Sequence, residues 1–599
     1  MNHLKPRGPL TAFLFFLVYL HQTLADPAIY CKPVPSSQNW PAQSAWQKLN
    51  ETISGRLFVD VPPGAVCHPG TSLFNNVTCA FVLSQWTNSS FHANNPISAD
   101  YNDDGCLPSP LAPCSVAAYP SYVVHATKAS DVQAAVEFAA NTGVRLIVKG
   151  TGHDLLSRSS GGQSLSIWTH NIVGVSVNTS DPRALPYGGV GSVKIAAGSR
   201  MAEVYREVAK HNLTVIAGGD MSVGIGGWVL GGGHSPISST YGLGADQILE
   251  MEVVTPDGEF VTINEKSYPD LFWAMRGGGG STFGVLISVT MKVYPTLPGS
   301  LAIFSINTTS NSDTFWSIST YFTSQVPSLS DKGANGYHYF VPYAPPNPPD
   351  QAGVIVGGYF FPNKTATQVN TILGPVITKI NTTDWGDGVF VATETIPIPD
   401  FTKFWMTNQP ETVGPSERLG SRLLTRGALT GNQTALENAL RTASNGTWTL
   451  LNHLVAGKGV RDAKIPGGNN SVCPAWRNNT YIHFASLFCQ VTYRQWTPLN
   501  QTEKTAVTDA LRNRAIEALR ILDPYTGAYV NEADPTEPNW QTTFWGSNYP
   551  RLLALKKKYD PKGIFWCKPC VGNELWNVTG SSATQDGIGQ DGGMICRSQ

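Results

Sequence analysis

A glycine-containing loop carries the residues with the clearest chemical potential. It reads K-G-T-G-H-D-L-L-S-R-S-S and spans residues 149–160. Gly150 and Gly152 allow backbone conformations in which amides approach a bound anion closely, and a phosphate is the expected anion. His153 adds a nucleophilic imidazole to the same loop. A lone histidine in a glycine loop is more often a structural hydrogen-bonding residue, so both roles are open at this point.

Two more glycine clusters follow along the chain. The segment 218–234, G-G-D-M-S-V-G-I-G-G-W-V-L-G-G-G-H, is the densest, and residues 270–280, D-L-F-W-A-M-R-G-G-G-G, contain the third. A dinucleotide-binding G-x-G-x-x-G fingerprint is one tight turn that opens a helix early in its domain. Here the glycines are spread over the whole of 218–234, which favours backbone lying along an extended ligand.

Strands and helices must position these loops. The apolar run 144–148, bounded by glycine, predicts a buried strand that delivers His153. A short strand at 122–124 and a helix with Ser130 as its cap and Gly143 at its end precede this run. The same strand and helix pattern recurs before the second glycine cluster. Both loops are therefore predicted to follow a strand of a domain that mixes helices and strands.

Later segments give further structural predictions. Strands on both sides of Asp257-Gly258 are predicted to form a hairpin. Residues 502–522 form the clearest helix, with apolar residues on one face. Between 298 and 528 the chain is rich in aromatic residues, prolines and glycosylation acceptors, and we expect a domain there that determines substrate selectivity.

Length and composition limit the functional classes. The chain has 599 residues, of which 41% are hydrophobic, so it can bury substantial cores in two domains or in one elaborate domain. Only 14% of the residues are charged, and the formal net charge is -1. Neither nucleic acid nor a membrane surface is therefore an expected partner. We expect a monomer that meets a small-molecule substrate.

The N-terminus predicts export. Lys5 and Arg7 precede an apolar run at 10–20 and a small-residue cleavage site at 23–25, which is the order of a secretory signal peptide. A membrane anchor is the alternative, but the run is too short to span a bilayer easily. We expect a secreted protein whose mature chain begins near Asp26.

Cysteines and glycosylation acceptors fit the same route. The chain has 10 cysteines, and an even number in an exported protein indicates disulfides without revealing their pairing. The C-x-x-C from Cys567 to Cys570 can be a redox pair or half of a zinc site, but it lacks a βαβ context and a second ligand pair. A disulfide half-site is therefore favoured, and no metal site is expected. N-x-S/T acceptors are dense, and many are expected to be glycosylated.

The order of these motifs resembles the berberine-bridge-enzyme-like flavoprotein oxidases of the vanillyl-alcohol-oxidase (VAO, PCMH-type) superfamily. The shared features are the loop histidine, the G-x-G-G-x-x-x-G-G-G run, the D-L-F-W-A-M-R-G-G-G-G stretch, and a terminal Y-x-N, W-G-x-N-Y-x-R-L and K-x-x-Y-D-P series. The stretch G-H-D-L-L-S-R-S-S-G-G-Q-S-L-S-I-W-T-H is similar to the fungal isoamyl-alcohol-oxidase-type branch. The resemblance covers residues 117–576.

The resemblance implies an α+β fold of two domains, with an antiparallel-sheet substrate domain lying over the flavin ring of an FAD-binding domain. Together with the two termini, the expected parts are a signal peptide at 1–25, a disulfide-rich and loop-dominated N-terminal extension at 26–116, the FAD-binding domain at 117–298, the substrate domain at 299–527, a C-terminal segment that returns to the FAD domain at 528–577, and a flexible tail at 578–599.

By motif position, the resemblance makes His153 the residue that joins FAD covalently at its 8α-methyl group. Asp220 stands where doubly linked members have a second attachment cysteine, so one covalent bond is expected. Val223 matches the position where valine accompanies reactivity toward O2, although a buried valine can simply pack against the ring. The other residues expected to hold FAD are Lys149, Gly150, Thr151, Gly152, Asp154, Leu155, Gly219, Gly224, Gly227, Gly231, Val285 and Asn531.

The resemblance also implies the chemistry. A substrate hydroxyl loses a proton, its carbon gives hydride to flavin N5, and O2 takes the electrons as hydrogen peroxide. Tyr529 is the candidate base or orienting hydroxyl, and Glu532 is a second candidate base. Tyr529 can equally be a core tyrosine with a satisfied hydroxyl.

Three functions are open at this stage. The favoured one is a secreted FAD-dependent oxidase of an alcohol in a small organic molecule, with fungal secondary metabolism as its expected setting. A carbohydrate oxidase of the same fold is the second. A non-catalytic, glycosylated binding protein is the third, although nothing structural requires a histidine at position 153 in such a protein.

Overall fold

The computed structural model describes residues 30–308, 312–342, 353–386, 388–408, 410–414, 417–447, 449–489, 491–492, 497–498, 501–579 and 593–598. The expected signal peptide lies outside these residues, and so does part of the expected tail, at 580–592. Within the described ranges, no helix is both long enough and apolar enough to cross a membrane.

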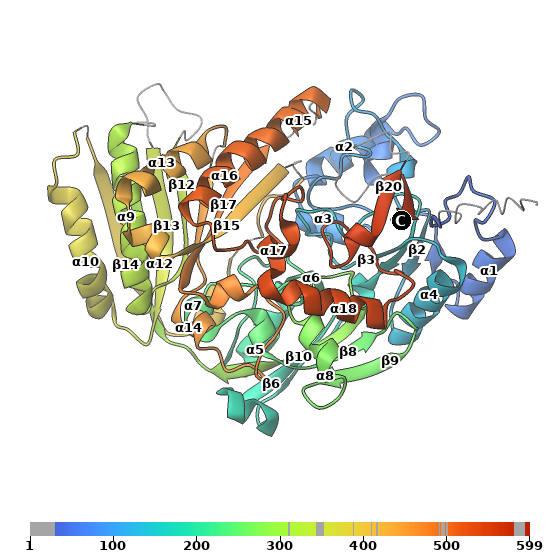
Figure 1. The fold of residues 1–599 in the computed structure, drawn as a ribbon, viewed down its shortest axis with the longest axis horizontal. Helices are drawn as coiled ribbons and strands as arrows, with labels where there is room; N and C mark the ends of the chain where they lie inside the picture. Colours follow the sequence, from blue (N-terminus) through green and yellow to red (C-terminus); the bar gives the residue numbers. More distant parts are fainter. Residues whose placement is uncertain are drawn as a thin grey trace, which may run out of the picture.

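A four-stranded sheet positions the histidine loop, on the right in Figure 1. Its order is β1–β2–β4–β3, with bounds Leu57–Phe58, Tyr122–His125, Leu165–Trp168 and Leu146–Lys149. β4 pairs in parallel with β2 and β3, and helix α4 (Ala129–Thr142) connects β2 to β3. Gly143 ends α4 in the left-handed conformation, as predicted. The loop with His153 therefore starts at the C-terminal end of a buried parallel strand.

The second sheet is antiparallel. Its order is β5–β6–β10–β8–β9, with β7 paired to β10, and the strands are Val175–Asn178, Gly191–Ala196, Val285–Pro295, Ile248–Val254 and Phe260–Asn264, with β7 at Leu213–Val215. The hairpin prediction is confirmed, because β8 and β9 pair antiparallel and Gly258 between them has a φ of 86°. Helices α5 (Met201–Lys210) and α8 (Pro269–Met275) belong to the same part of the chain.

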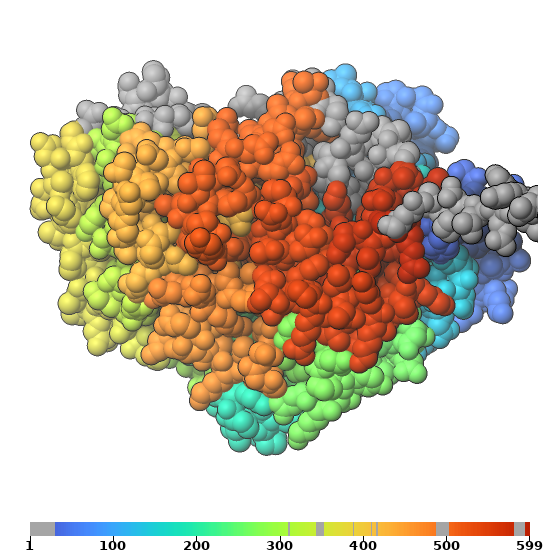
Figure 2. Space-filling view, in the orientation of Figure 1, coloured from blue at the N-terminus to red at the C-terminus, as the bar shows by residue number. Residues whose placement is uncertain are grey.

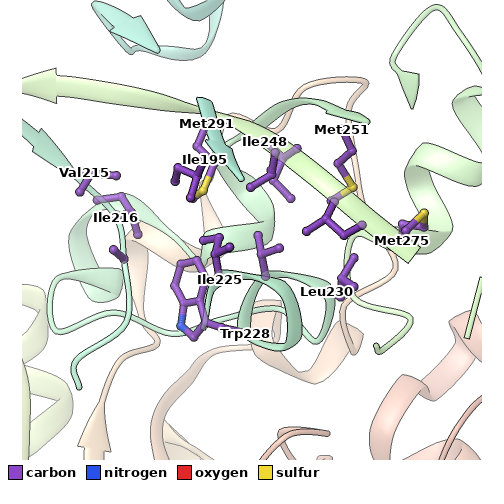
Figure 3. Close-up of a cluster of buried hydrophobic side chains, with 14 of the residues drawn as sticks. Ile195, Val215, Ile216, Ile225, Trp228, Leu230, Ile248, Met251, Met275 and Met291 are labelled. Carbon is purple, nitrogen blue, oxygen red and sulfur yellow. The ribbon is translucent and has the colours of Figure 1, made fainter. Parts of the chain in front are cut away.

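A buried apolar core lies between this sheet and helix α6 (Ile225–Leu230), which is part of the densest glycine cluster. Ile195, Ile248 and Met291 extend from three strands into the same cluster of side chains as Ile225 and Trp228 of α6 (Figure 3). Burying each large apolar side chain contributes roughly 1.5–3 kcal/mol. This packing holds α6 in place through its apolar face.

A seven-stranded antiparallel sheet forms the other half of the molecule, on the left in Figure 1. Its order is β14–β11–β13–β12–β16–β17–β15, with bounds Phe390–Ile398, Gly299–Thr308, Gly353–Pro362, Asn335–Val341, Leu450–Leu454, Thr480–Cys489 and Glu417–Thr425. Helices α9 (Asp313–Asp331), α10 (Ala366–Thr382) and α13 (Gln433–Ser444) share its hydrophobic core. The predicted helix at 502–522 is present as α15 (Gln501–Ala510), a π-helical stretch and α16 (Glu517–Leu522).

The N-terminal extension contains more regular structure than the expected loops. Helices α1 (Gln43–Thr52), α2 (Asn76–Gln85) and α3 (Ser89–Ala93) lie within it, and β1 adds an edge strand to β2. The side chains of Asn75 and Asn88 accept backbone hydrogen bonds at the starts of α2 and α3. Such caps stabilise short helices, which explains why the apolar pattern of the sequence did not reveal α2 and α3.

The C-terminal segment returns to the first half of the molecule. Helices α17 (Trp540–Trp545) and α18 (Tyr549–Tyr559) follow Asn531, and Phe565 makes a bridge to Leu146 of β3. Figure 2 shows this segment, in red, beside the green surface of residues near 270.

Four disulfides join described residues: Cys31–Cys596, Cys67–Cys79, Cys106–Cys114 and Cys567–Cys570. Two expectations are thereby corrected. Cys567 pairs with Cys570 itself, because the turn between them brings the two thiols together, so the motif is not a half-site for separate partners. Residues 593–598 are not a free tail, because β21 (Met594–Arg597) pairs with β20 (Trp576–Thr579) and Cys596 is bonded to Cys31. Cys473 is a buried free thiol.

Candidate active site

One cavity of about 1000 Å³ is lined by residues of both halves of the molecule. The three glycine clusters, the seven-stranded sheet and the C-terminal segment all contribute to its wall. Most residues that the sequence singled out line it, namely Gly150, Thr151, Gly152, His153, Asp154, Leu155, Gly219, Asp220, Val223, Gly224, Gly227, Val285, Tyr529, Asn531 and Glu532. Lys149 and Gly231 are not among the lining residues.

Glycines leave open space along the cavity wall. A methyl group added at Gly227 or Gly280 would meet no described atom within 4 Å. At Gly150 or Gly226 it would meet one atom, at 3.9 or 3.8 Å respectively. Bare backbone at these points forms a cradle that side chains would fill. Gly152 differs, because its φ is 91° and an added methyl group would lie 3.1 Å from a backbone oxygen of the N-terminal extension.

His153 lies between two carboxylates. Its Nδ1 is 2.8 Å from Oδ2 of Asp100, which is fully buried, and its Nε2 is 3.1 Å from Oε1 of Glu411. Burial lowers the pKa of His153, but the hydrogen bonds and charges of Asp100 and Glu411 outweigh burial and raise that pKa well above its usual value. Glu411 lines the cavity, whereas Asp100 belongs to the N-terminal extension behind the loop. Asp100 therefore orients the ring with Nε2 on the cavity side.

Lys149 contributes to the loop in a way that the sequence did not reveal. Its ammonium group is buried and donates to the carbonyl oxygens of Asn95 and Thr151 at 2.9 and 3.1 Å, and burial lowers its pKa to about 7. It therefore ties the loop to the N-terminal extension and does not face the cavity. Gly231 is needed for packing, because an added methyl group there would lie 2.4 Å from the side chain of Asn531.

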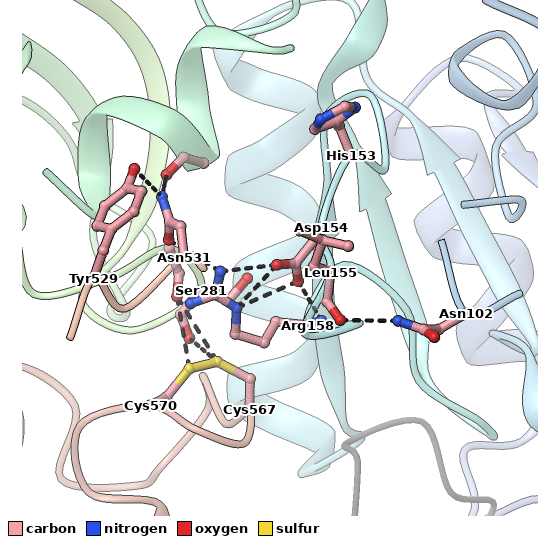
Figure 4. A network of polar contacts seen from close by, with 12 residues as sticks. Asn102, His153, Asp154, Leu155, Arg158, Ser281, Tyr529, Asn531, Cys567 and Cys570 are labelled. Atoms are coloured by element: carbon pink, nitrogen blue, oxygen red, sulfur yellow. Dashed lines mark hydrogen bonds and ion pairs between the residues drawn. A yellow bond between two sulfur atoms is a disulfide. The ribbon is translucent and has the colours of Figure 1, made fainter. Parts of the chain in front are cut away.

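Arg158 connects the histidine loop to the C-terminal segment (Figure 4). Its Nη2 donates to Oδ1 of Asp154 at 2.8 Å and to Oδ1 of Asn531 at 3.0 Å. Asn531 in turn donates to the carbonyl oxygen of Gly227 at 3.0 Å. Nη1 of Arg158 is buried in the cavity wall without a hydrogen bond to any described residue. A buried cationic donor of this kind fits an anionic ligand.

Tyr529 is held by two hydrogen-bond donors. Its hydroxyl oxygen accepts from the backbone N–H of Gly233 at 3.2 Å and from Nδ2 of Asn531 at 3.0 Å. Burial, together with the charge of Glu532, raises the pKa of Tyr529. The phenol therefore keeps its proton near neutral pH, which favours an orienting hydroxyl over a base.

Three histidines surround the carboxylate of Glu532. Its Oε1 is 2.9 Å from Nε2 of His234, and its Oε2 is 3.4 Å from Nδ1 of His483 and 3.9 Å from Nδ1 of His453. Burial raises the pKa of Glu532, but the three imidazoles outweigh burial and hold that pKa well below its usual range. Burial lowers the pKa of His483 to about 4 and that of His453 well below its usual value.

The second ring nitrogen of His234 is available to the cavity. With Nε2 donating to Glu532, Nδ1 carries a lone pair, and its nearest polar partner is the hydroxyl of Tyr337 at 3.5 Å. Both His234 and Tyr337 line the cavity. An imidazole oriented by a carboxylate in this way can accept a proton from a bound hydroxyl group.

Two features of the wall bear on the number of covalent bonds to a cofactor. Asp220 lines the cavity and accepts hydrogen bonds from the backbone N–H groups of Ser222 and Glu411, each at 2.7 Å. The Cys567–Cys570 disulfide lies beside Ser281, near Asn531 and Arg158 (Figure 4). Both sulfurs are consumed by the disulfide, so neither is a free thiol.

Comparison with known proteins decides the family. Residues 120–264 match the FAD binding domain family and residues 528–572 the family described as berberine and berberine like. The chain is 35% identical over 600 residues, 95% of this chain and 98% of the relative, to an uncharacterized FAD-linked oxidoreductase of Arthroderma benhamiae. It is 32% identical over 571 residues, covering 92% and 94% of the two chains, to the VAO-type flavoprotein oxidase VAO615 of Thermothelomyces thermophilus. This chain belongs to the berberine-bridge-enzyme-like family of FAD-linked oxidoreductases.

The solved structures agree with this family. The crystal structure of the VAO-type flavoprotein MtVAO713 from Myceliophthora thermophila C1 matches with a TM-score of 0.85 and 26% identity, covering 95% of this chain and 100% of that chain. The expected α+β, VAO-type fold is therefore confirmed, as is FAD as the cofactor. The cavity fits that cofactor, because open glycine backbone suits a flat ring system and Nη1 of Arg158 suits a pyrophosphate. A non-catalytic binding protein is no longer a competing function.

The sequence did not reveal several residues whose side chains contact His153 or Glu532 in this site. His234 ends the densest glycine cluster, so its position was a usable signal. Asp100 lies in an extension without clear periodicity, and nothing in the sequence connects it with His153. His453 and His483 are paired across β16 and β17, and only the register of the sheet brings them together.

Proposed function

We propose that this chain is a secreted FAD-dependent oxidase that converts a hydroxyl group of a small organic molecule into a carbonyl group, with O2 reduced to hydrogen peroxide. FAD, attached through His153, supplies the redox chemistry. The observation that carries this proposal is the His234–Glu532 pair, an oriented proton acceptor in the wall of the same cavity that His153 faces.

The contacts of His153 support covalent attachment. Asp100 accepts the proton on Nδ1, so loss of the second ring proton leaves the lone pair of Nε2 on the cavity side, and a neutral imidazole oriented in this way is a competent nucleophile. Because Asp220 replaces a second attachment cysteine, we propose a single bond. Loop amides between Lys149 and Leu155 and the guanidinium of Arg158 would hold the pyrophosphate, although the amides of His153 and Asp154 already donate within the loop.

Proton removal falls to His234 in this proposal. Nδ1 takes the hydroxyl proton, and the carboxylate of Glu532 stabilises the imidazolium that results. Tyr529 and Asn531 hold the surrounding backbone at Gly233 and Gly227. Val223 lines the cavity with a small side chain, which leaves access for O2.

A carbohydrate oxidase remains the second candidate because of one observation. Four aromatic side chains line one part of the cavity. Tyr337 and Tyr339 come from β12 of the seven-stranded sheet, and Phe404 and Trp405 come from helix α11 (Phe401–Trp405). Aromatic rings of this kind can pack against the apolar faces of sugar rings. Secretion is supported by the four disulfides and by the signal-peptide pattern.

Peroxide release tests the proposal. The flavin-loaded full chain would be assayed with a panel of primary and secondary alcohols and of oligosaccharides. Release with small alcohols, lost in His234→Gln while flavin is retained, supports the first function. Release with oligosaccharides alone supports the second. Flavin reduction without peroxide formation in air contradicts both oxidase assignments.

A further inference from the structure

We propose that His234, His453, His483 and Glu532 form a binding site for one divalent transition-metal ion of the zinc class. Four separate parts of the chain supply these residues, which is why the sequence pattern predicted no metal site. The inference does not depend on the identity of the substrate or on the attachment of FAD.

The distances suit such an ion. One ligand atom from each of the four residues can be chosen so that all four lie within 4.8 Å of one another. The separations between the carboxylate oxygens and the imidazole nitrogens are 2.9, 3.4 and 3.9 Å. In a tetrahedral site with bonds of about 2.0–2.1 Å, ligand atoms lie about 3.3 Å apart. Small side-chain movements would therefore complete the coordination.

The hydrogen bonding of the cluster also points to a ligand. Nδ1 of His453 and both ring nitrogens of His483 are buried without a hydrogen bond of normal geometry to any described residue, although the two Nδ1 atoms face Oε2 of Glu532 at 3.9 and 3.4 Å. Buried polar atoms are nearly always satisfied in folded proteins, so unsatisfied nitrogens that converge on a carboxylate indicate a missing partner.

The scaffold holds the ligands rigidly. His453 and His483 are directly opposite each other on β16 and β17. The backbone oxygen of Glu532 accepts a hydrogen bond from the hydroxyl of Ser421 on β15. The ring of Trp476 stacks on His483, with 6.1 Å between ring centroids. Three imidazoles and one carboxylate placed in this way favour zinc, copper, nickel or iron over calcium or magnesium.

The site faces the cavity on one side. His234, His453 and Glu532 line the cavity, while His483 is fully buried behind them. Four protein ligands would fill a tetrahedral ion, so water or a substrate oxygen would reach it only as a fifth ligand from the cavity side. Coordination through Nε2 of His234 moves the ring proton to Nδ1. Metal binding and base action by His234 therefore exclude each other.

Equilibrium dialysis of the full chain tests the proposal. The protein would be stripped with a chelator, dialysed against Zn²⁺, and analysed for zinc by plasma mass spectrometry. His453→Gln, His483→Gln and Glu532→Gln each remove one ligand at nearly constant volume. His211→Gln, at a partly exposed histidine paired with Glu207, is the matched control.

We expect one Zn²⁺ per wild-type chain and per His211→Gln chain. Each ligand variant should bind Zn²⁺ more weakly, by more than the roughly 10- to 100-fold that loss of a ligand's hydrogen-bond partner costs. Wild-type protein without stoichiometric zinc, or ligand variants that bind as tightly as the control, would overturn the proposal. The side chain of Glu532 is partly exposed, and Glu532→Gln preserves its shape, so this variant should fold. It keeps the test decisive if a buried histidine variant fails to fold. Zinc binding in a chain whose zinc-free, flavin-loaded form shows no oxidase activity would reject the proposed function alone.

Discussion

Oδ2 of Asp100 lies 2.8 Å from Nδ1 of His153, although 53 positions separate the two residues in the chain. The hydroxyl of Ser89 donates to the same oxygen at 2.8 Å, and the backbone N–H of Asp100 donates to the carbonyl of Gly152 at 3.1 Å. The N-terminal extension therefore holds a buried carboxylate against the histidine that we propose to carry FAD. Attachment of the cofactor should depend on this extension.

Replacing the carboxylate should slow attachment. Asp100→Ala removes the acceptor that fixes the tautomer and orientation of His153. At a pH where His153 is neutral in both proteins, we therefore expect covalent FAD to form roughly 10- to 100-fold more slowly, the scale on which orienting partners of a histidine act. Flavin fluorescence of the denatured band, followed over time after adding FAD to apoprotein, measures this rate. Asp60→Ala is the control, because Asp60 lies in the same extension and its carboxylate is paired with a different histidine, His125 of β2. Equal rates in both variants would argue against an orienting role for Asp100.

Attachment should also depend on pH. The hydrogen bonds and charges of Asp100 and Glu411 outweigh burial and raise the pKa of His153, and Tyr101 is the neighbouring titratable group that contacts its ring. A raised pKa keeps the imidazole protonated near neutral pH, and only the neutral ring is a nucleophile. The attachment rate should therefore rise with pH and level off above the pKa of His153. Asp100→Asn should shift this rise downward by about one pH unit or more. A profile that falls with rising pH would contradict the assignment.

The proposed base can be separated from its neighbour. His234→Gln should lower the rate of anaerobic flavin reduction by substrate about 10²- to 10⁴-fold, the usual contribution of a general base, without loss of bound flavin. Tyr529→Phe should have a smaller effect, because its hydroxyl accepts hydrogen bonds from Gly233 and Asn531 and keeps its proton. Stopped-flow bleaching of the flavin measures both rates. The reverse order of effects would make Tyr529 the base.

Two glycines should respond to alanine in opposite ways. Gly152 has a φ of 91° and a carbonyl oxygen 3.1 Å from an added methyl group, so Gly152→Ala should destabilise the fold by about 1–3 kcal/mol. Gly227 is helical and open, so Gly227→Ala should leave stability unchanged or raise it by up to about 1 kcal/mol. The added methyl group at 227 should instead weaken FAD uptake, because it projects into the cavity. Thermal unfolding and FAD titration of both variants measure the two effects. Normal FAD uptake by Gly227→Ala would show that Gly227 does not contact the cofactor.

Helix ends and turns could be predicted from the sequence where the conformation of one or two residues determines them. The end of α4 at Gly143 and the hairpin at Gly258 were predictable, because a residue without a Cβ is favoured at positive φ. Helices α2 and α3 of the N-terminal extension were not, because caps at Asn75 and Asn88 support them in place of a strong apolar period. The fold class came from the order of several motifs and not from any single one.

The site was predictable only along the motif-bearing loops. His153 and most of the glycines that line the cavity lie in sequence clusters. The partners that set their chemistry come from elsewhere, Asp100 from the extension and His483 from a strand position that only sheet register determines. The direction of a side chain could not be predicted from the sequence either. Lys149 is an example, because its ammonium group points away from the cavity. Long-range pairing therefore limits what can be inferred from one sequence.

Covalent attachment of FAD through His153 is the central claim, and flavin fluorescence of a denaturing gel tests it most directly. Flavin-replete wild-type protein should give a fluorescent band, and its peptide containing His153 should carry the mass of FAD. His153→Ala should fold, as judged by thermal unfolding, and give a band without fluorescence. A wild-type band without fluorescence, or fluorescence that persists in His153→Ala, would contradict the account.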